Sequence, residues 1–339
     1  MHEKSSSISA GLGPADRVGG ASLAVEVVGL VKSFDGHVAL DDLDLTAAEG
    51  AVTALIGPNG SGKTTTVRVL STLLPPDRGR ASVFGHDVTR EPEAVRAAIG
   101  VTGQFSAIDG LLTGRENLAL MADLHHLKAA AARERVTSLL ERFDLVEAAD
   151  RRAMTYSGGM QRRLDLAMTM VGQPRIVFLD EPTAGLDPAG RQVLWRIVRD
   201  LVDEGVTILL TTQYLEEADR LADRVALIDR GRLVAEGTPS ELKGRIPGGH
   251  IRLQFPDTAA LAAAREVFTE ALAQQDGSSL VLASDGSVTG LRAVLDQLDR
   301  HRLAVASVSA EPADLDDVFF ALTGTGPDRS APAAVEAAR

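Results

Sequence analysis

The sequence contains no cysteine, which excludes disulfide bonds, thiolate metal sites and a cysteine nucleophile. It has no run of about 18 consecutive apolar residues and no apolar core of a secretory signal near its start, so it predicts no membrane-spanning helix. Acidic residues exceed basic ones by 47 to 35, for a net charge of −12. This balance disfavours a general nucleic-acid binder, which relies on attraction to phosphates. No nucleic-acid partner is expected, and any membrane role requires a partner protein.

The 339 residues, 45% of them hydrophobic, are enough for one large domain and a smaller companion. Short runs of Val, Ile and Leu alternate with helical stretches over residues 23–245, a pattern typical of an α/β domain with buried strands. The strand runs vanish at about 105–172, which predicts a helical insertion. Residues 246–324 are predicted to form an accessory α/β domain. The small and polar compositions of residues 1–22 and 325–339 predict flexible tails.

The accessory domain has the strand and helix order of a split βαβ unit. A strand is expected at IRLQF, which starts at Ile251, and a final helix at 312–324. The elements expected between them are a helix at 259–273, a strand at 279–284, a helix at 288–301 and a strand at 303–309.

The segment GPNGSGKT has the spacing of a phosphate-binding loop and lies between a predicted strand and a predicted helix. Its glycines allow main-chain N–H groups to surround phosphate oxygens. Lys63 should reach the β- and γ-phosphates, and the Thr64 hydroxyl should bind Mg²⁺. The alternative is a glycine-rich turn that binds nothing. The predicted phosphate-binding residues are Gly57, Pro58, Asn59, Gly60, Ser61, Gly62, Lys63, Thr64 and Thr65.

Two acidic residues end the apolar strand that begins at Arg175. Asp180, held at a buried strand tip, can orient a Mg²⁺-bound water opposite Thr64. Glu181 can polarise the attacking water as a general base. The alternative is a solvated acidic turn. After a phosphate-binding loop, at the separation expected for two strands of one sheet, the catalytic pair is favoured.

The segment YSGGMQRRL, which starts at Tyr156, and the following PTAGLDP resemble the signature motif and D-loop of the ABC ATPase family. The alternative for SGG is a simple helix N-cap. The resemblance implies a P-loop NTPase of ABC type, an α/β fold with a RecA-like core, an antiparallel β subdomain and a helical subdomain. It also implies that ATP and Mg²⁺ are sandwiched between two copies of the chain, one copy presenting Ser157, Gly158, Gly159, Gln161 and Asp187.

Three further residues are assigned by the same resemblance. Phe34 lies where an aromatic ring stacks on adenine, with an ordinary core residue as the alternative. Gln104 matches the Q-loop residue, which senses Mg²⁺ or the lytic water beside the membrane partner. Gln213 replaces the usual switch-loop histidine; its amide can bind the γ-phosphate and water but cannot relay a proton. We expect catalysis to persist with Glu181 as the base.

The segments TTQYLEEADRLADR and DDVFFALTG resemble the daunorubicin-resistance type of drug-exporting ATPase subunits. This likeness implies ATP-driven efflux of a hydrophobic antibiotic through separate multi-helix permease subunits, with the chain peripheral at the cytoplasmic face of the membrane. The first alternative is an ABC ATPase outside transport, of the translation or DNA-repair type, although those usually carry paired cassettes or a long coiled-coil insertion. The second is a P-loop kinase or metabolic ATPase, which has no need of the signature motif.

Overall fold

The computed structural model describes residues 22–103, 107–245, 249–269, 271–273, 278–284, 287–312 and 314–323. The predicted tail at 325–339, nearly all of the tail at 1–22, and Gln104 lie outside the described residues. None of the helices in these ranges combines the length and apolar character needed to span a bilayer.

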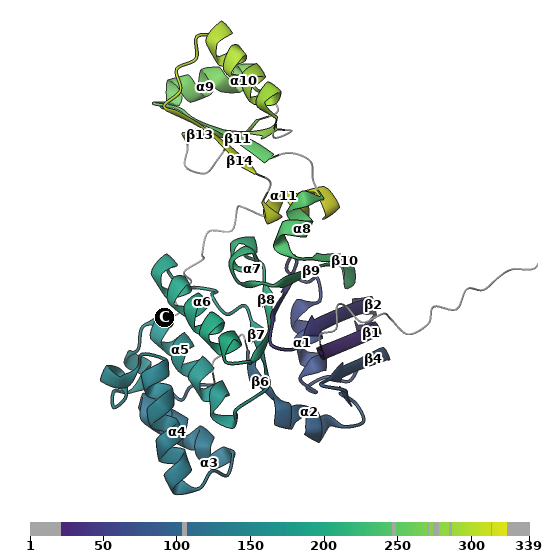
Figure 1. The fold of residues 1–339 in the computed structure, drawn as a ribbon, viewed down its shortest axis with the longest axis vertical. Helices are drawn as coiled ribbons and strands as arrows, with labels where there is room; N and C mark the ends of the chain where they lie inside the picture. Colours follow the sequence, from purple (N-terminus) through teal and green to yellow (C-terminus); the bar gives the residue numbers. More distant parts are fainter. Residues whose placement is uncertain are drawn as a thin grey trace, which may run out of the picture.

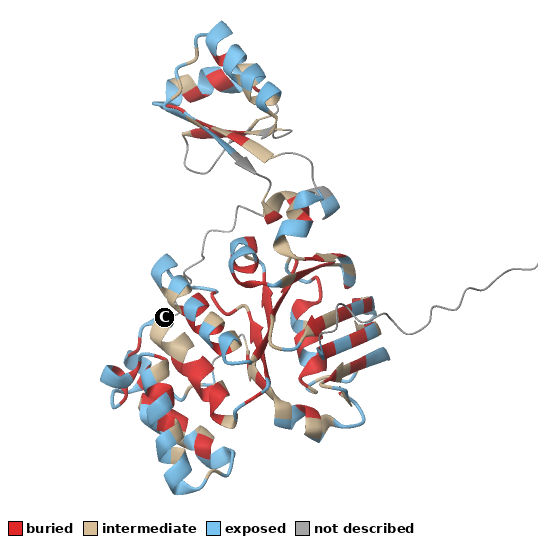
Figure 2. Cartoon of the chain, viewed as in Figure 1, coloured by how far each residue is buried: buried red, intermediate tan, exposed pale blue. Residues whose placement is uncertain are grey.

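A six-stranded sheet forms the centre of the molecule, in the order β10-β9-β3-β8-β7-β6 (Figure 1). Neighbouring strands from β9 to β6 are parallel, and only β10 is antiparallel, because the turn at Arg230 and Gly231 has positive φ at both residues and reverses the chain. Strands β3, β7 and β8 are buried along their whole length (Figure 2). The strands are β3 (Val52–Ile56), β6 (Ile99–Thr102), β7 (Ile176–Asp180), β8 (Thr207–Thr212), β9 (Arg224–Asp229) and β10 (Arg232–Gly237).

Alternate residues along these strands belong to two different hydrophobic cores, one on each face of the sheet. Phe178 packs with Val67 of α1, whereas Leu179 packs with Leu164 of α5. Helices α1 and α5 therefore cover opposite faces. The helices that pack on the sheet are α1 (Lys63–Leu70), α5 (Gly158–Thr169), α6 (Pro188–Asp203) and α7 (Leu215–Leu221).

An antiparallel sheet in the order β2-β1-β4-β5 shares the core on the α1 side. Its strands are β1 (Leu23–Phe34), β2 (His37–Ala48), β4 (Arg78–Val83) and β5 (His86–Asp87), and the short helix α2 (Pro92–Ala98) follows. The helical insertion predicted at about 105–172 contains α3 (Gly114–Leu124), α4 (Ala129–Arg142) and α5. The predicted α/β architecture with antiparallel and helical subdomains is confirmed.

The accessory unit has the sheet order β12-β13-β11-β14, with every neighbouring pair antiparallel, as in a split βαβ fold. The helix predicted at 259–273 is wrong at its end, because α9 stops at Val267 and Leu272 pairs with Val281. Phe268, at the end of α9, is buried in the accessory core, so the chain turns back there. The elements are β11 (Gly249–Gln254), α9 (Thr258–Val267), β12 (Leu272–Ala273), β13 (Ser279–Ser284), α10 (Val288–Arg300) and β14 (Ser307–Pro312).

The last described helix, α11 (Leu315–Thr323), returns to the large domain and packs on α7 and α8 (Pro239–Gly244) (Figure 1). Leu315, Val318 and Phe319 are buried in the same core as Trp195 and not in the accessory core. The boundary predicted at residue 245 therefore does not separate α11 from the large domain in packing.

We expect Leu315→Ala to lower the free energy of unfolding by about 2–5 kcal/mol, because it leaves a cavity in the large core. Leu322→Ala is the matched control on the same helix, since Leu322 is 42% exposed, and should change stability by less than about 0.5 kcal/mol. Urea unfolding followed by the fluorescence of Trp195, the single tryptophan, measures both. Equal effects of the two substitutions would contradict the packing of α11.

Candidate nucleotide-binding site

Three strands of the central sheet end at one edge and place the predicted site residues together. In the parallel register Ile56 of β3 is level with Thr212 of β8, and Asp180 of β7 is level with Thr211. The segments after these strands surround a cavity of about 520 Å³. It is lined by Phe34, His37, Ala39, Asn59, Gly60, Gly62, Lys63, Thr64, Thr65, Asp180, Glu181 and Gln213.

The loop between β3 and α1 requires glycine at two positions. A Cβ on Gly57 would lie 2.2 Å from the carbonyl oxygen of Ile228. Gly62 has a φ of 107°, and its Cβ would lie 2.6 Å from the carbonyl oxygen of Ala39. The hydroxyl of Ser61 is buried and has no hydrogen-bond partner among the described residues. Such a buried polar atom beside a phosphate-binding loop is suited to a ligand oxygen.

Lys63 is only 5% exposed, and its Nζ donates to the carbonyl oxygens of Gly57 at 2.8 Å and Pro58 at 3.0 Å. Burial lowers the pKa of Lys63, while the negative charges of Glu181 and Asp180 act in the opposite direction. A phosphate at the mouth of the loop would offer this ammonium a charged acceptor in place of neutral carbonyls.

Asp180 is 4% exposed at the end of β7 and meets two threonine hydroxyls. Thr64 Oγ1 donates to Asp180 Oδ1 at 3.3 Å, and the hydroxyl of Thr211 donates to the same oxygen. Carboxylate and hydroxyl oxygens are the ligands that Mg²⁺ prefers, so the side chains of Thr64 and Asp180 fit this ion.

Glu181 follows Asp180 in the left-handed region, with a φ of 49°. Its N–H donates to Thr211 at the end of β8, to the carbonyl oxygen at 3.0 Å and to Oγ1 at 3.2 Å. This conformation is uncommon for a residue with a side chain, so the turn at Glu181 depends on the contacts that hold it. Glu181 lines the cavity together with Lys63. A general base that activates a water next to a bound phosphate requires such a position.

The adenine end of the predicted site lies at the hairpin between β1 and β2. Phe34 is 41% exposed at the cavity, which contradicts the alternative of an ordinary core residue and leaves its ring available for stacking. Lys32 Nζ lies 5.6 Å from the centre of this ring. His37 and Ala39 also line the cavity and were not predicted. The only feature of the sequence that could have placed these two residues at the cavity is that they follow Phe34 after a turn that contains glycine.

The residues of the signature segment and the D-loop lie outside this cavity in the single chain. Ser157 is the N-cap of α5 and accepts from the N–H of Met160 at 3.3 Å, and a Cβ on Gly159 would meet open space. Gln161 Nε2 donates to the carbonyl oxygen of Ala153 at 3.4 Å. Asp187 is the N-cap of α6 and accepts from Gly190 N–H at 2.8 Å. Gly158 is exposed beside Ser157. The nucleotide contacts of these residues stay predictions.

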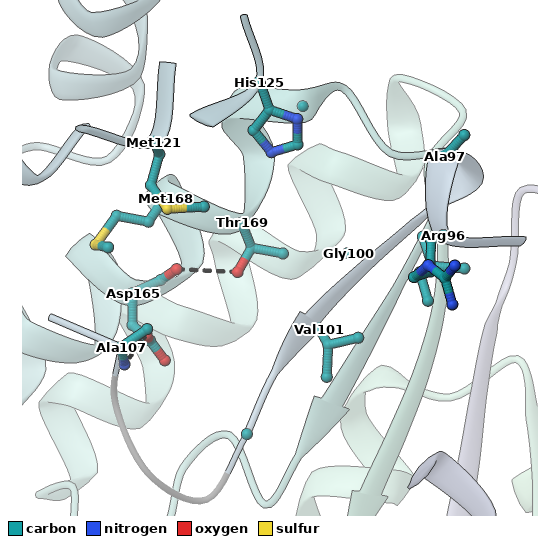
Figure 3. A pocket seen from close by; sticks show the side chains of 13 residues that line it. Arg96, Ala97, Gly100, Val101, Ala107, Met121, His125, Asp165, Met168 and Thr169 are labelled. Atoms are coloured by element: carbon teal, nitrogen blue, oxygen red, sulfur yellow. Dashed lines mark hydrogen bonds between the residues drawn. The ribbon is translucent and has the colours of Figure 1, made fainter. Parts of the chain in front are cut away.

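A second cavity, of about 270 Å³, lies between the helical insertion and the edge of the central sheet (Figure 3). Its lining residues include Met121 of α3, His125 directly after α3, Met168 of α5 and Arg96 of α2. Gly103 and Ala107, which flank the predicted Q-loop residue, line it as well. Its lining combines apolar side chains with Arg96 and Asp165, and it adjoins the end of β6.

Glu217 of α7 is a buried acid that the sequence did not single out. It is 1% exposed, and its Oε1 accepts from Trp195 Nε1 at 3.4 Å. Burial raises the pKa of Glu217, opposed by nearby hydroxyl and indole donors and by the charge of Arg162. In sequence, the Glu216-Glu217 pair has the appearance of a solvated helix start, so no signal distinguishes the buried member.

Comparisons with known proteins agree with this geometry. The family model described as ABC transporter matches residues 40–184. The chain is 50% identical to the daunorubicin/doxorubicin resistance ATP-binding protein DrrA of Streptomyces peucetius over 92% of this chain and 96% of that protein. It is 38% identical to the Nod factor export ATP-binding protein I of Paraburkholderia xenovorans, over 89% and 97%. A solved ATP-binding subunit of an ABC transporter superposes with a TM-score of 0.59 at 29% identity, over 66% and 92%.

We expect the stability of Glu217→Gln relative to the wild type to rise with pH. Because the folded-state pKa of Glu217 is raised above the ordinary value of 4.5, the folded chain holds a proton that the unfolded chain loses just above that pH. Wild-type stability then falls as pH rises to the folded-state pKa, whereas glutamine does not titrate. Urea unfolding at a series of pH values measures the difference.

Glu216→Gln is the control for this prediction, because Glu216 is an exposed neighbour paired with Arg220 at 3.3 Å. Its stability difference from the wild type should stay nearly constant over the same range. A pH-independent difference for Glu217→Gln would contradict a raised pKa for this carboxyl.

Proposed function

Because the chain belongs to the ABC transporter family of ATP-binding subunits, we propose that it hydrolyses ATP to power the export of a hydrophobic, antibiotic-like compound through a separate membrane permease. The observation that carries the ATPase activity is the single cavity lined by Lys63, Thr64, Asp180 and Glu181. Support for the exported compound comes from the relatives, one named for drug resistance and another for export.

In the proposed reaction, loop N–H groups and the Lys63 ammonium bind the β- and γ-phosphates, and the ring of Phe34 stacks on adenine. Thr64 and Asp180 would hold Mg²⁺, which neutralises developing charge on the phosphates. Glu181 accepts a proton from the attacking water. Gln213, which lines the same cavity, orients that water through its amide. The bond between the γ-phosphorus and the bridging oxygen breaks, and ADP and phosphate are released.

The proposed assembly contains two copies of the chain around two nucleotides. Ser157 and Gly158 are exposed at the N-terminus of α5, where N–H groups and the helix dipole favour an anion. They lie outside the cavity of their own chain, as residues that complete the partner's site would. Asp187 and Gln161 belong to the same proposed interface. Hydrolysis then removes the ligand that holds the two copies together.

The permease is proposed to contact the second cavity, between the helical insertion and the central sheet. Its position supports this, because Gly103 at its wall directly follows β6, and Thr102 of β6 is level with Leu179, the neighbour of Asp180. The chain would then be peripheral at the cytoplasmic face of the membrane. A non-transport ABC ATPase of the translation or DNA-repair type is less well supported, since the family-matched segment is a single cassette with a modest helical insertion.

We expect Glu181→Gln to bind ATP, to hydrolyse it at least about 100-fold more slowly, and to accumulate as a closed dimer. The glutamine keeps the size of the side chain but cannot accept a proton from water. Size-exclusion chromatography with light scattering at saturating Mg-ATP measures the dimer.

The control is the double variant Ser157→Arg with Glu181→Gln, which keeps its own cavity but places a bulky cation at the proposed interface. It should bind ATP with unchanged affinity and remain monomeric. A monomeric Glu181→Gln protein at saturating Mg-ATP, or a double variant that still dimerises, would argue against the sandwich.

The export proposal is tested by ATPase measurement on a complex of this chain co-expressed and co-purified with a candidate multi-helix permease. Adding an anthracycline such as daunorubicin should stimulate hydrolysis severalfold in the complex and leave the isolated chain unchanged, because no residue of the ATP cavity is assigned to the drug. A complex of Lys63→Ala with the permease is the background control. Absence of stimulation by anthracyclines and other hydrophobic antibiotics alike would reject the proposed cargo class.

A further inference from the structure

Arg162 of the signature helix α5 contacts the main chain on both sides of Glu181. Its Nε donates to the carbonyl oxygen of Pro182 at 2.8 Å, and its Nη2 donates to the carbonyl oxygen of Asp180 at 3.1 Å. One guanidinium therefore holds the two carbonyls that flank the proposed general base. The planar fork of arginine suits two such acceptors at once.

This turn is held by two elements, the neighbouring strand β8 and helix α5. From β8, Thr211 accepts the N–H of Glu181. From α5, Arg162 fixes the carbonyls before and after it. Because Glu181 has a left-handed backbone, with a φ of 49°, the turn needs such support to keep its conformation.

Arg162 is a charged side chain in a buried place, only 15% exposed. Burial lowers the pKa of Arg162, and the negative charges of Asp165, Glu217 and Asp180 oppose this effect. Its Nη1 donates to Asp165 Oδ2 at 3.3 Å and to the carbonyl oxygen of Gly103 at 3.2 Å. A buried ion pair adds little net stability compared with apolar packing, so the placement points to a role in geometry.

We propose that Arg162 is a positioning residue for ATP hydrolysis, which aims the Glu181 carboxylate by fixing the turn from Asp180 to Pro182. The proposal rests on the proposed role of Glu181 as the general base. In the proposed two-copy assembly it also has a consequence. Ser157 caps the helix that carries Arg162. Binding of the partner's nucleotide at Ser157 would therefore affect the position of the Glu181 carboxylate, which acts on the chain's own nucleotide.

The test compares Arg162→Gln with Arg163→Gln. Arg163 is the matched control, because it is 16% exposed on the same helix and also donates to carbonyl oxygens, of Phe143 at 3.1 Å and Asp144 at 2.9 Å. These lie at the end of α4, away from Glu181. Arg162→Gln should lower kcat about 10- to 100-fold, with the Kd for ATP within about twofold, as expected when a catalytic group is misplaced.

Arg163→Gln should lower the Tm and leave kcat within about twofold. Arg162→Lys should give an intermediate kcat, because an ammonium keeps the charge but cannot span both carbonyls in the same plane. If Arg162→Gln does not fold, Arg162→Lys decides: a reduced kcat with unchanged ATP affinity supports the proposal, and a wild-type kcat overturns it.

A double variant separates positioning from general damage. If Arg162 acts through Glu181, adding Arg162→Gln to Glu181→Gln should cause no further loss in the rate of single-turnover hydrolysis. If the two residues act independently, the fold losses of the single variants should multiply in the double variant. A further loss of 10-fold or more overturns the proposal and leaves the role of Glu181 intact. Full activity of Glu181→Gln alone would instead reject the general base, and the positioning role with it.

Discussion

One carboxylate, that of Asp180, fixes the arrangement on which the whole site depends. It is buried at the end of β7 and accepts from Thr64 at the start of α1 and from Thr211 at the end of β8. The register of the parallel sheet makes this possible, because Asp180 and Thr211 are level with each other. Strand tips in a buried sheet move little, so the phosphate-binding loop and Glu181 take their places relative to this carboxylate. The cavity between them is a consequence of that register.

Buried charge lies on both sides of the end of β7, and each side serves a different purpose. On the α1 side, Lys63 faces Asp180 and Glu181, a set of charges that a nucleotide with its metal ion can complete. On the α5 side, Arg162 donates four hydrogen bonds within the chain, to Asp165 and to three main-chain carbonyls. The first set is suited to binding a ligand, and the second to holding the turn. Removing one member of either set leaves a buried charge uncompensated, which is costly.

Features with local causes could be predicted from the sequence, and those that depend on distant contacts could not. The phosphate-binding loop is a run of eight residues with fixed spacing, and Asp180 directly ends an apolar strand, so both were found. Arg162 reaches carbonyls 18 to 20 residues away, across a turn whose path no pattern specifies. The final helix was predicted from the sequence, but not that its apolar residues pack in the core of the large domain. The early end of α9 likewise depends on the pairing of Leu272 with β13.

The geometry of a single chain also explains why a second copy is needed in the proposed mechanism. The described residues of the cavity offer a cation, loop N–H groups and two carboxylates, all from one edge of the central sheet. The exposed N-terminus of α5 is a separate surface suited to an anion, and Gly159 leaves open space beside it. A triphosphate bound in the cavity is charged on every side, so the face turned away from the loop requires donors of its own. A second copy related by a twofold axis supplies them twice, once for each nucleotide. Each α5 would then contact one nucleotide through Ser157 and, through Arg162, hold the carboxylate that acts on the other.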